Sequence, residues 1–191
     1  MKRLNTGFTL MELLIVIGVL GILAAGLLAA IDPFEQLKKA RDSNYRSGAI
    51  ELLQSVQRYY ANHGYFPWRN TGSTCATDAT AALAPSTPGT SLSAQMVKVG
   101  VSQDSLINTC LVDLISDGEL KSTFKQGLNT TVYLSSWTKT DARVCFSPES
   151  KSTRNDSQTI FNLDSTGGTP VLALGCTSTQ KDAGVCLQCF Q

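Results

Sequence analysis

The chain has 191 residues, which is enough for one domain of about 150 residues in addition to an apolar segment. Lys and Arg number 16 and Asp and Glu 15, so the net charge is +1 and no basic field indicates nucleic acid as the main partner. Only 16% of the residues are charged, and Ser, Thr, Gly and Asn are plentiful after Thr71, which indicates a loop-rich extracytoplasmic domain with β-structure.

The N-terminal segment is a short basic leader, residues 1–7, followed by an apolar stretch, residues 8–31. No charge occurs from Leu13 to Ile31, and at about 1.5 Å per residue this stretch forms roughly 28 Å of helix, close to the thickness of a bilayer core. Glu12 lies at the start of the apolar stretch, where a carboxylate among lipid tails costs about 3 kcal/mol. A plain membrane anchor has no need of this residue.

Three interpretations of this segment are possible. A cleaved secretory signal fits poorly, because the apolar core is too long and the residues around Ala29 do not form a suitable cleavage site. An ordinary uncleaved anchor accounts for the length but not for Glu12. In the third interpretation the leader is removed between Gly7 and Phe8, so that Phe8 becomes the N-terminus.

The third interpretation is favoured by a motif. Lys2 and Arg3 followed by Gly7–Ile17, GFTLMELLIVI, resemble the class III signal of type IV pilins and the related type II secretion pseudopilins. The resemblance implies that a prepilin peptidase cleaves after Gly7 and that the Phe8 amine is methylated. It also implies that Glu12 pairs with the N-terminal amine of a neighbouring subunit and sets the register of a fibre. The simpler alternative for Glu12 is a helix-start carboxylate at the headgroup boundary.

The orientation of the segment depends on two signals. Lys2 and Arg3 favour an intracellular leader, whereas Lys38, Lys39 and Arg41 lie on the other side of the span. All the cysteines follow the span, which indicates disulfides in an oxidising compartment and therefore a C-terminal domain outside the cytoplasmic membrane. They are Cys75, Cys110, Cys145, Cys176, Cys186 and Cys189.

Helical periodicity predicts one long helix from Phe8 to about Asn62, kinked near Pro33. Its second half carries one apolar stripe that the domain should cover: Leu37, Ala40, Tyr45, Ala49, Leu52, Leu53, Val56 and Tyr60. We expect Asp42 on the opposite, polar face. Gly64 fits a left-handed helix end, and Tyr59–Pro67, YYANHGYFP, also resembles the stretch that closes the first helix of pilins and pseudopilins.

The middle of the chain has few signals of chemistry. We expect a loop over residues 69–100 with a short helix near Thr77–Leu83, and then a helix over Asp104–Leu120 with Ser102 or Asp104 as its cap and Gly118 as its stop. Asp113, Asp117 and Glu119 raise the question of Ca²⁺, but no ligand loop is visible and a solvated face is favoured. His63, the only histidine, is interpreted as a cap or surface residue.

Four strands are predicted, at 131–137, 142–146, 158–163 and 170–174. Their short or polar connections favour an antiparallel meander whose apolar face covers the long helix. The fold class is therefore α+β, with a long N-terminal helix packed on a small antiparallel sheet, as in pilins. The C-terminal cysteines are expected to staple a loop, since zinc would need a further close pair of ligands. A sequential pairing, 75 with 110, 145 with 176 and 186 with 189, is one guess among many.

No catalytic constellation, metal site or cofactor site is apparent in the sequence. The predicted organisation is a leader (1–7), a transmembrane and polymerisation helix (8–31) and an extracytoplasmic domain (32–191). The predicted function is that of a structural subunit of a type IV pilus. Its partners would be copies of itself or related pilins, prepilin peptidase, the pilus or secretion assembly machinery and the cytoplasmic membrane. The alternatives are a type II secretion pseudopilin, a competence-type minor pilin that contacts DNA, or a membrane-anchored binding protein.

Overall fold

The computed structural model describes residues 7–30, 32–70, 75, 94–100, 105–128, 131–136, 140–164 and 171–191. The chain forms two compact units, Met1–Leu37 and Lys38–Gln191. The helix expected over 77–83 and the cap expected at Ser102 or Asp104 lie outside the described residues. Two helices account for the first third of the chain: α1 over Leu10–Ala30 and α2 over Pro33–His63.

The prediction of one kinked helix is wrong, because α1 ends at Ala30 and α2 begins at Pro33. Proline has no N–H to continue a helix but is well suited to the first helical position. Asp32 caps the new helix: its Oδ1 accepts hydrogen bonds from the backbone N–H groups of Phe34 at 3.1 Å and Glu35 at 3.2 Å. The Asp32–Pro33 dipeptide therefore starts a second helix instead of bending the first.

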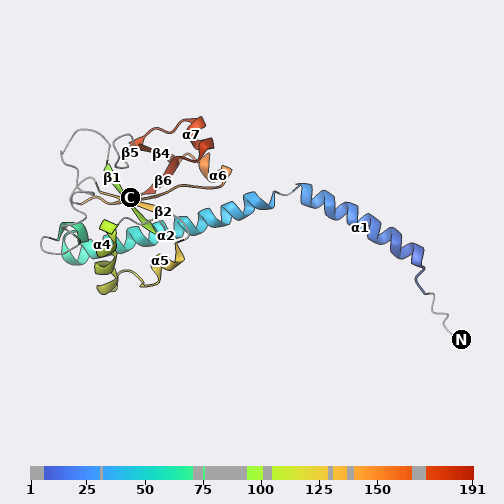
Figure 1. The fold of residues 1–191 in the computed structure, drawn as a ribbon, viewed down its shortest axis with the longest axis horizontal. Helices are drawn as coiled ribbons and strands as arrows, with labels where there is room; N and C mark the ends of the chain where they lie inside the picture. The colour runs from blue at the N-terminus through green and yellow to red at the C-terminus, as the bar shows by residue number, and fades with distance from the viewer. Residues whose placement is uncertain are drawn as a thin grey trace. The chain divides into compact units, whose positions relative to one another are not determined.

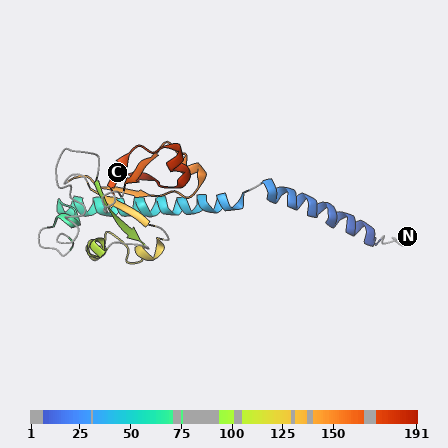
Figure 2. The same cartoon turned by 45° about the horizontal axis from the view of Figure 1, so that its top comes forward.

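The second unit combines α2 from Lys38 onward with short helices and an antiparallel sheet (Figure 1). In two views α4 and α5 lie on one side of α2, and α6, α7 and strands β4–β6 lie on the other (Figure 2). The helical elements after α2 are η1 (Pro67–Arg69), α4 (Ser105–Ser116), α5 (Phe124–Gly127), α6 (Lys151–Arg154) and α7 (Ser178–Ala183).

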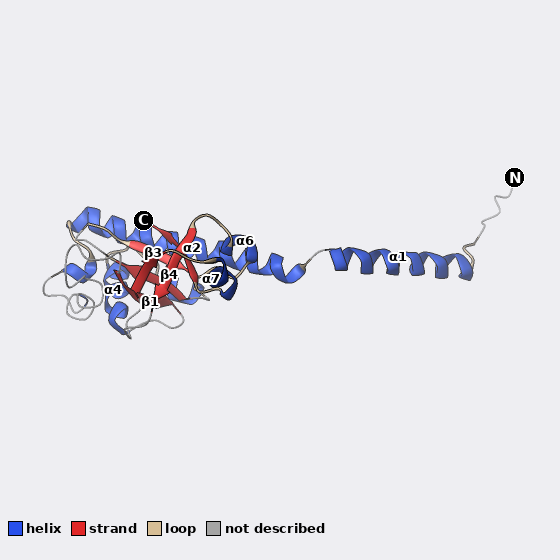
Figure 3. Cartoon of the chain, turned by 90° about the horizontal axis from the view of Figure 1, so that it is seen from above, coloured by secondary structure: helices blue, strands red, loops and turns tan. Residues whose placement is uncertain are grey.

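The strands gather into one sheet beside α2 (Figure 3). They are β1 (Ala94–Gly100), β2 (Thr131–Ser135), β3 (Arg143–Phe146), β4 (Thr159–Asp164), β5 (Val171–Leu174) and β6 (Cys186–Phe190). All pairings are antiparallel, and the order β1-β2-β3-β6-β4-β5 closes into a barrel through the β1–β5 pair. The α+β class and the antiparallel sheet are confirmed.

The meander is wrong at one point. The predicted strands pair as two hairpins, β2 with β3 and β4 with β5, but β6 lies between β3 and β4. β1 falls in a region expected to be a loop, and β6 in a tail expected to be a stapled loop. Both strands are held by partners distant in the chain, which local patterns do not reveal.

The core forms where α2 meets the sheet, η1 and α4. From Tyr45 onward the predicted stripe is confirmed, with Ala49, Leu52 and Val56 fully buried beside Phe146 and Trp68. On β3, Val144 and Phe146 belong to this core, whereas Cys145 belongs to a second cluster with Leu187. Alternate residues of β3 therefore pack on opposite faces of the sheet.

The stripe differs from the prediction at its two ends. Leu37 is 56% exposed and Ala40 is exposed, so the domain does not cover the first turns of α2. At the other end Tyr59 is buried and Tyr60 only partly so. Gly64 and Gly118 have φ values of 79° and 77°, which confirms left-handed residues after α2 and α4.

Candidate processing and assembly segment

The first turn of α1 is closed by a capping box formed by Thr9 and Glu12. The Glu12 backbone N–H donates to Thr9 Oγ1 at 3.2 Å, and the Thr9 backbone N–H donates to Glu12 Oε2 at 2.9 Å. The Thr9 hydroxyl also donates to Glu12 Oε2, at 2.7 Å. Thr9 is thus the N-cap and Glu12 the N3 residue, as in the T-x-x-E pattern.

Only one oxygen of the Glu12 carboxylate is used in this box. Within the described residues, Glu12 Oε1 has no hydrogen-bond partner. The carboxylate is therefore already held at the start of the helix and can still accept a further donor. Thr9 was missed in the sequence analysis, although the Thr9–Glu12 spacing was the available signal.

Gly7 and Phe8 lie immediately before this capped turn. A Cβ added at Gly7 would meet no atom within 4 Å, so packing inside the subunit does not explain the glycine. Phe8 is 76% exposed. The predicted cleavage bond therefore lies at exposed residues just ahead of a helix, and Gly7, Phe8 and Glu12 lie within one short stretch.

The surface of α1 is apolar and exposed from Leu10 to Leu28. Its apolar side chains are strongly exposed, from Leu10 at 81% to Leu28 at 73%, and Val16, at 45%, is still exposed. Among the described residues, Leu10–Leu28 is the one helix long and apolar enough to cross a membrane, judged by length and composition. Such a surface has to be covered by lipid or by other protein chains.

Two of the acidic residues considered for Ca²⁺, Asp117 and Glu119, have other partners. Glu119 binds Arg58 Nε through Oε2 at 2.7 Å and Asn62 Nδ2 through Oε1 at 2.8 Å. Asp117 Oδ2 lies 3.2 Å from His63 Nε2, and His63 Nδ1 lies 3.1 Å from the Tyr59 carbonyl oxygen. In the described parts of the chain, no group of three or more His, Cys, Asp or Glu residues could hold a metal ion.

All six cysteines form disulfides, but only one guessed pair is correct. Cys75 pairs with Cys110, as guessed, whereas Cys145 pairs with Cys189 and Cys176 with Cys186. Residues 186 and 189 are three apart on one strand, so their side chains leave opposite faces of the sheet. Cys145 lies directly across from Cys189 in the β3–β6 register, which places their sulfur atoms within bonding reach.

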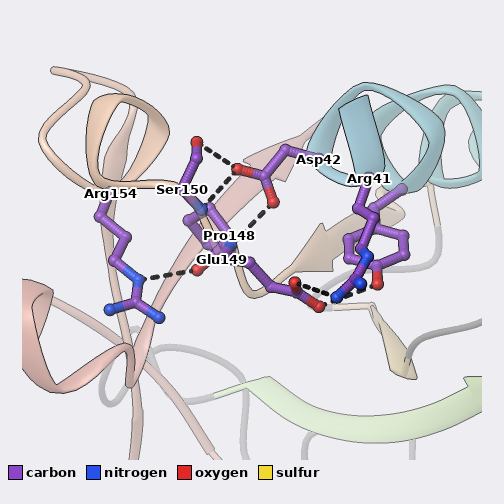
Figure 4. A network of polar contacts seen from close by, with 7 residues as sticks. Arg41, Asp42, Pro148, Glu149, Ser150 and Arg154 are labelled. Carbon is purple, nitrogen blue, oxygen red and sulfur yellow. Dashed lines mark hydrogen bonds and ion pairs between the residues drawn. The ribbon is translucent and has the colours of Figure 1, made fainter. Parts of the chain in front are cut away.

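A polar network joins α2 to the segment after β3 (Figure 4). Asp42 is 3% exposed, so its predicted place on the polar face is wrong. Its Oδ1 accepts from the Glu149 backbone N–H at 2.7 Å, and its Oδ2 accepts from the Ser150 N–H at 2.9 Å and hydroxyl at 2.6 Å. Asp42 precedes Tyr45 by three residues, so helical spacing could have placed it on the buried face.

Glu149 extends the network to the surface. Its carboxylate accepts from the Tyr45 hydroxyl at 2.9 Å and from Arg41 Nη1 at 3.1 Å. Burial, assisted by the hydrogen bond to Glu149, raises the pKa of the Tyr45 hydroxyl. Arg154 Nε donates to the Pro148 carbonyl oxygen at 3.0 Å and so holds the same segment from its other side (Figure 4). This network therefore ties α2 to the segment after β3.

Comparison with known proteins matches part of the chain. Residues 2–28 match the family model of the prokaryotic N-terminal methylation motif. A fimbrial protein of Neisseria meningitidis serogroup B is 42% identical over 77 residues, 40% of this chain and 44% of that protein. A type IV major pilin protein, PilE1, of Neisseria gonorrhoeae is 42% identical over 71 residues, 37% of this chain and 42% of that protein.

The aligned part is less than half of these curated relatives. No solved structure matches the chain. The match to the methylation-motif model includes the capped start of α1 and most of the apolar helix.

Proposed function

We propose that this chain is a type IV pilin, a structural subunit that polymerises through α1 into a pilus. The observation that carries the proposal is the start of α1. Among the described residues, Glu12 is bound by Thr9 through one carboxylate oxygen and its other oxygen has no partner, at the head of a helix whose apolar side chains are exposed. A methylation-motif match over the same residues supports this assignment.

The proposed assembly begins with removal of the leader by prepilin peptidase. Cleavage between Gly7 and Phe8 gives Phe8 a free amine, which is subsequently methylated and remains a cation. In the fibre this amine pairs with Glu12 of a neighbouring subunit, and the α1 helices cover one another's apolar surfaces. If neighbouring subunits were shifted along the fibre axis, Glu12 or the amine would be buried without a partner. The pair therefore favours one axial offset between neighbours.

The location follows from the same segment. Before assembly α1 lies in the cytoplasmic membrane with the domain on the extracytoplasmic side, and after assembly the domain forms the surface of the pilus. The named relatives are major pilins and fimbrial proteins, which favours a surface pilus over a secretion pseudopilus. The partners are copies of the same chain and the pilus assembly machinery.

Replacement of Glu12 tests the role of the carboxylate. In cells that lack the wild-type chain, we expect Glu12→Ala to lower the amount of chain in sheared filaments by more than about ten-fold. The reason is that a buried, unpaired amine costs roughly 3 kcal/mol per added subunit. Immunoblots of the sheared and membrane fractions measure this ratio.

Thr9→Val is the matched control for the Glu12 experiment. It removes the hydroxyl of the capping box while leaving the carboxylate in place, so we expect its assembly to remain close to wild type. Normal leader removal and a wild-type amount of Glu12→Ala chain in filaments would contradict the proposed role of Glu12.

A further inference from the structure

The uncovered beginning of α2 has a distinct surface. We call this surface the entry face; it consists of Phe34, Leu37, Lys38 and Arg41. These residues are spaced by three, one and three positions, so they share one side of α2. Four residues further on, Tyr45 continues the same side into the core. The entry face is thus the extension of the buried stripe beyond the part that the sheet covers.

The entry face is both apolar and basic. Phe34 is 74% exposed and Leu37 56% exposed, although neighbouring stripe positions further along α2 are buried. Lys38 is half-buried and the adjacent Lys39 is exposed. Within the described residues neither lysine forms a hydrogen bond or ion pair, although Glu35 precedes them by three and four residues. The Arg41 side chain is 59% exposed and is bound on one side by Glu149 at 3.1 Å.

The order of these residues along the chain matches the layers of a bilayer. The membrane-length segment Leu10–Leu28 comes first, then Phe34 and Leu37, and then the basic residues. Hydrocarbon, the interfacial region and lipid phosphates follow one another in the same order. Basic residues that follow a span emerge near the headgroup phosphates, and anionic lipids attract them electrostatically.

We propose that, while the subunit waits in the membrane, the entry face docks on the headgroup layer of the leaflet nearest the domain. Phe34 and Leu37 enter the interfacial region, and Lys38 and Lys39 bind the phosphates of anionic phospholipids. This proposal rests on the proposed function only in requiring that α1 lie in the bilayer. It adds a lipid contact that holds the first turns of α2 before assembly and has to be released when the subunit enters a fibre.

A lipid surface fits the entry face better than a second copy of the chain. From Leu13 to Ala30, α1 has no carboxylate, so the helix expected to pack beside a neighbour offers no partner to Lys38 or Lys39. Anionic headgroups supply many phosphates at the depth where the basic residues emerge. Each lysine near such a surface contributes a roughly five-fold preference for anionic over neutral lipid.

Amide hydrogen exchange of the full chain in vesicles tests this proposal. The chain is reconstituted in phosphatidylcholine alone and in phosphatidylcholine containing about one third phosphatidylglycerol, a fraction typical of strongly anionic membranes. We expect the amides of residues 34–41 to exchange more slowly in the anionic vesicles by about five-fold per engaged lysine. Lys38→Gln/Lys39→Gln should abolish the difference, because it removes the basic pair without touching the Arg41–Glu149 contact.

Lys121→Gln/Lys151→Gln is the matched control, since it makes the same change in net charge at exposed positions of the domain. It should retain the slow exchange in anionic vesicles. Equal exchange in the two vesicle types would overturn the proposal. So would protection that appears only in filaments and persists in Lys38→Gln/Lys39→Gln, since a second copy would then be the occupant. The vesicle comparison does not depend on pilus assembly, and protection in filaments presupposes assembly, so either result would overturn the lipid contact and leave the proposed function standing.

Discussion

Asp42 is the only charged side chain buried among the described residues. Its two carboxylate oxygens accept three hydrogen bonds from Glu149 and Ser150, and two of the donors are backbone N–H groups. Ser150 is also the N-cap of α6, with its hydroxyl accepting from the Thr153 N–H. One carboxylate on α2 therefore positions both the end of the segment after β3 and the start of the next helix.

Replacement of Asp42 should destabilise the domain. We expect Asp42→Ala to lower the free energy of unfolding by about 3 kcal/mol, because it leaves buried N–H groups without an acceptor. Urea unfolding of the full chain in detergent measures the change. Asp182→Ala, at an exposed position, should stay within about 0.5 kcal/mol of wild type. Equal effects of the two substitutions would show that the network contributes nothing to stability.

Asp113 should contribute more to the free energy of unfolding in acid than at neutral pH. Burial raises the pKa of the Asp113 carboxyl and the charge of Asp117 raises it further, while Asp113 Oδ2 is buried without a hydrogen-bond partner. A raised folded-state pKa means that the native chain binds the proton more tightly than the unfolded chain. This contribution is fully present below the unfolded-state pKa and is lost as pH rises through the folded-state pKa.

Asp113→Asn should therefore unfold at a higher temperature than wild type at pH 7. This advantage should disappear in acid, where the wild-type carboxyl is protonated. Thermal unfolding followed by circular dichroism, from pH 7 into acid, checks the sign of the difference in unfolding temperature. Asp182→Asn serves as the exposed control. A variant that is less stable than wild type at pH 7 would contradict this explanation.

At the scale of elements, local patterns predicted those parts of the fold that local interactions determine. Both helical segments of the N-terminal third and the four predicted strands are present, and Gly64 and Gly118 end their helices as expected. The sequence did not reveal β6, because CLQCF is short and its cysteines suggested a loop. Its place between β3 and β4 depends on pairing across 44 residues, which no local pattern encodes.

The two C-terminal disulfides should differ in their contribution to stability. The Cys145–Cys189 bond closes a loop with a sequence separation of 44, and the Cys176–Cys186 bond one with a separation of 10. Loop-closure entropy then gives stabilisations of about 4 and about 3 kcal/mol, respectively. Cys145→Ala/Cys189→Ala should therefore lower the urea midpoint more than Cys176→Ala/Cys186→Ala. The reverse order would show that the Cys145–Cys189 bond is not the disulfide that contributes more to stability.

At the scale of the whole molecule, the chain combines an exposed apolar helix with a separately packed domain. The sequence predicted the assembly residues Gly7, Phe8 and Glu12 from a motif, and their roles stay predictions. It did not predict that Thr9 holds Glu12, or that the domain leaves the first turns of α2 uncovered. Both features depend on which residues contact one another in the folded chain, and residue types alone do not specify those contacts.

The most direct test of the central claim is the mass of the chain in purified surface filaments. Intact-protein mass spectrometry with N-terminal fragmentation should find a chain that begins at Phe8 and carries a methyl group on its amine, with all six cysteines oxidised. A filament fraction devoid of this chain, or a membrane pool that retains Met1 in cells with active prepilin peptidase, would contradict the claim that Gly7 is the cleavage site of a polymerising subunit.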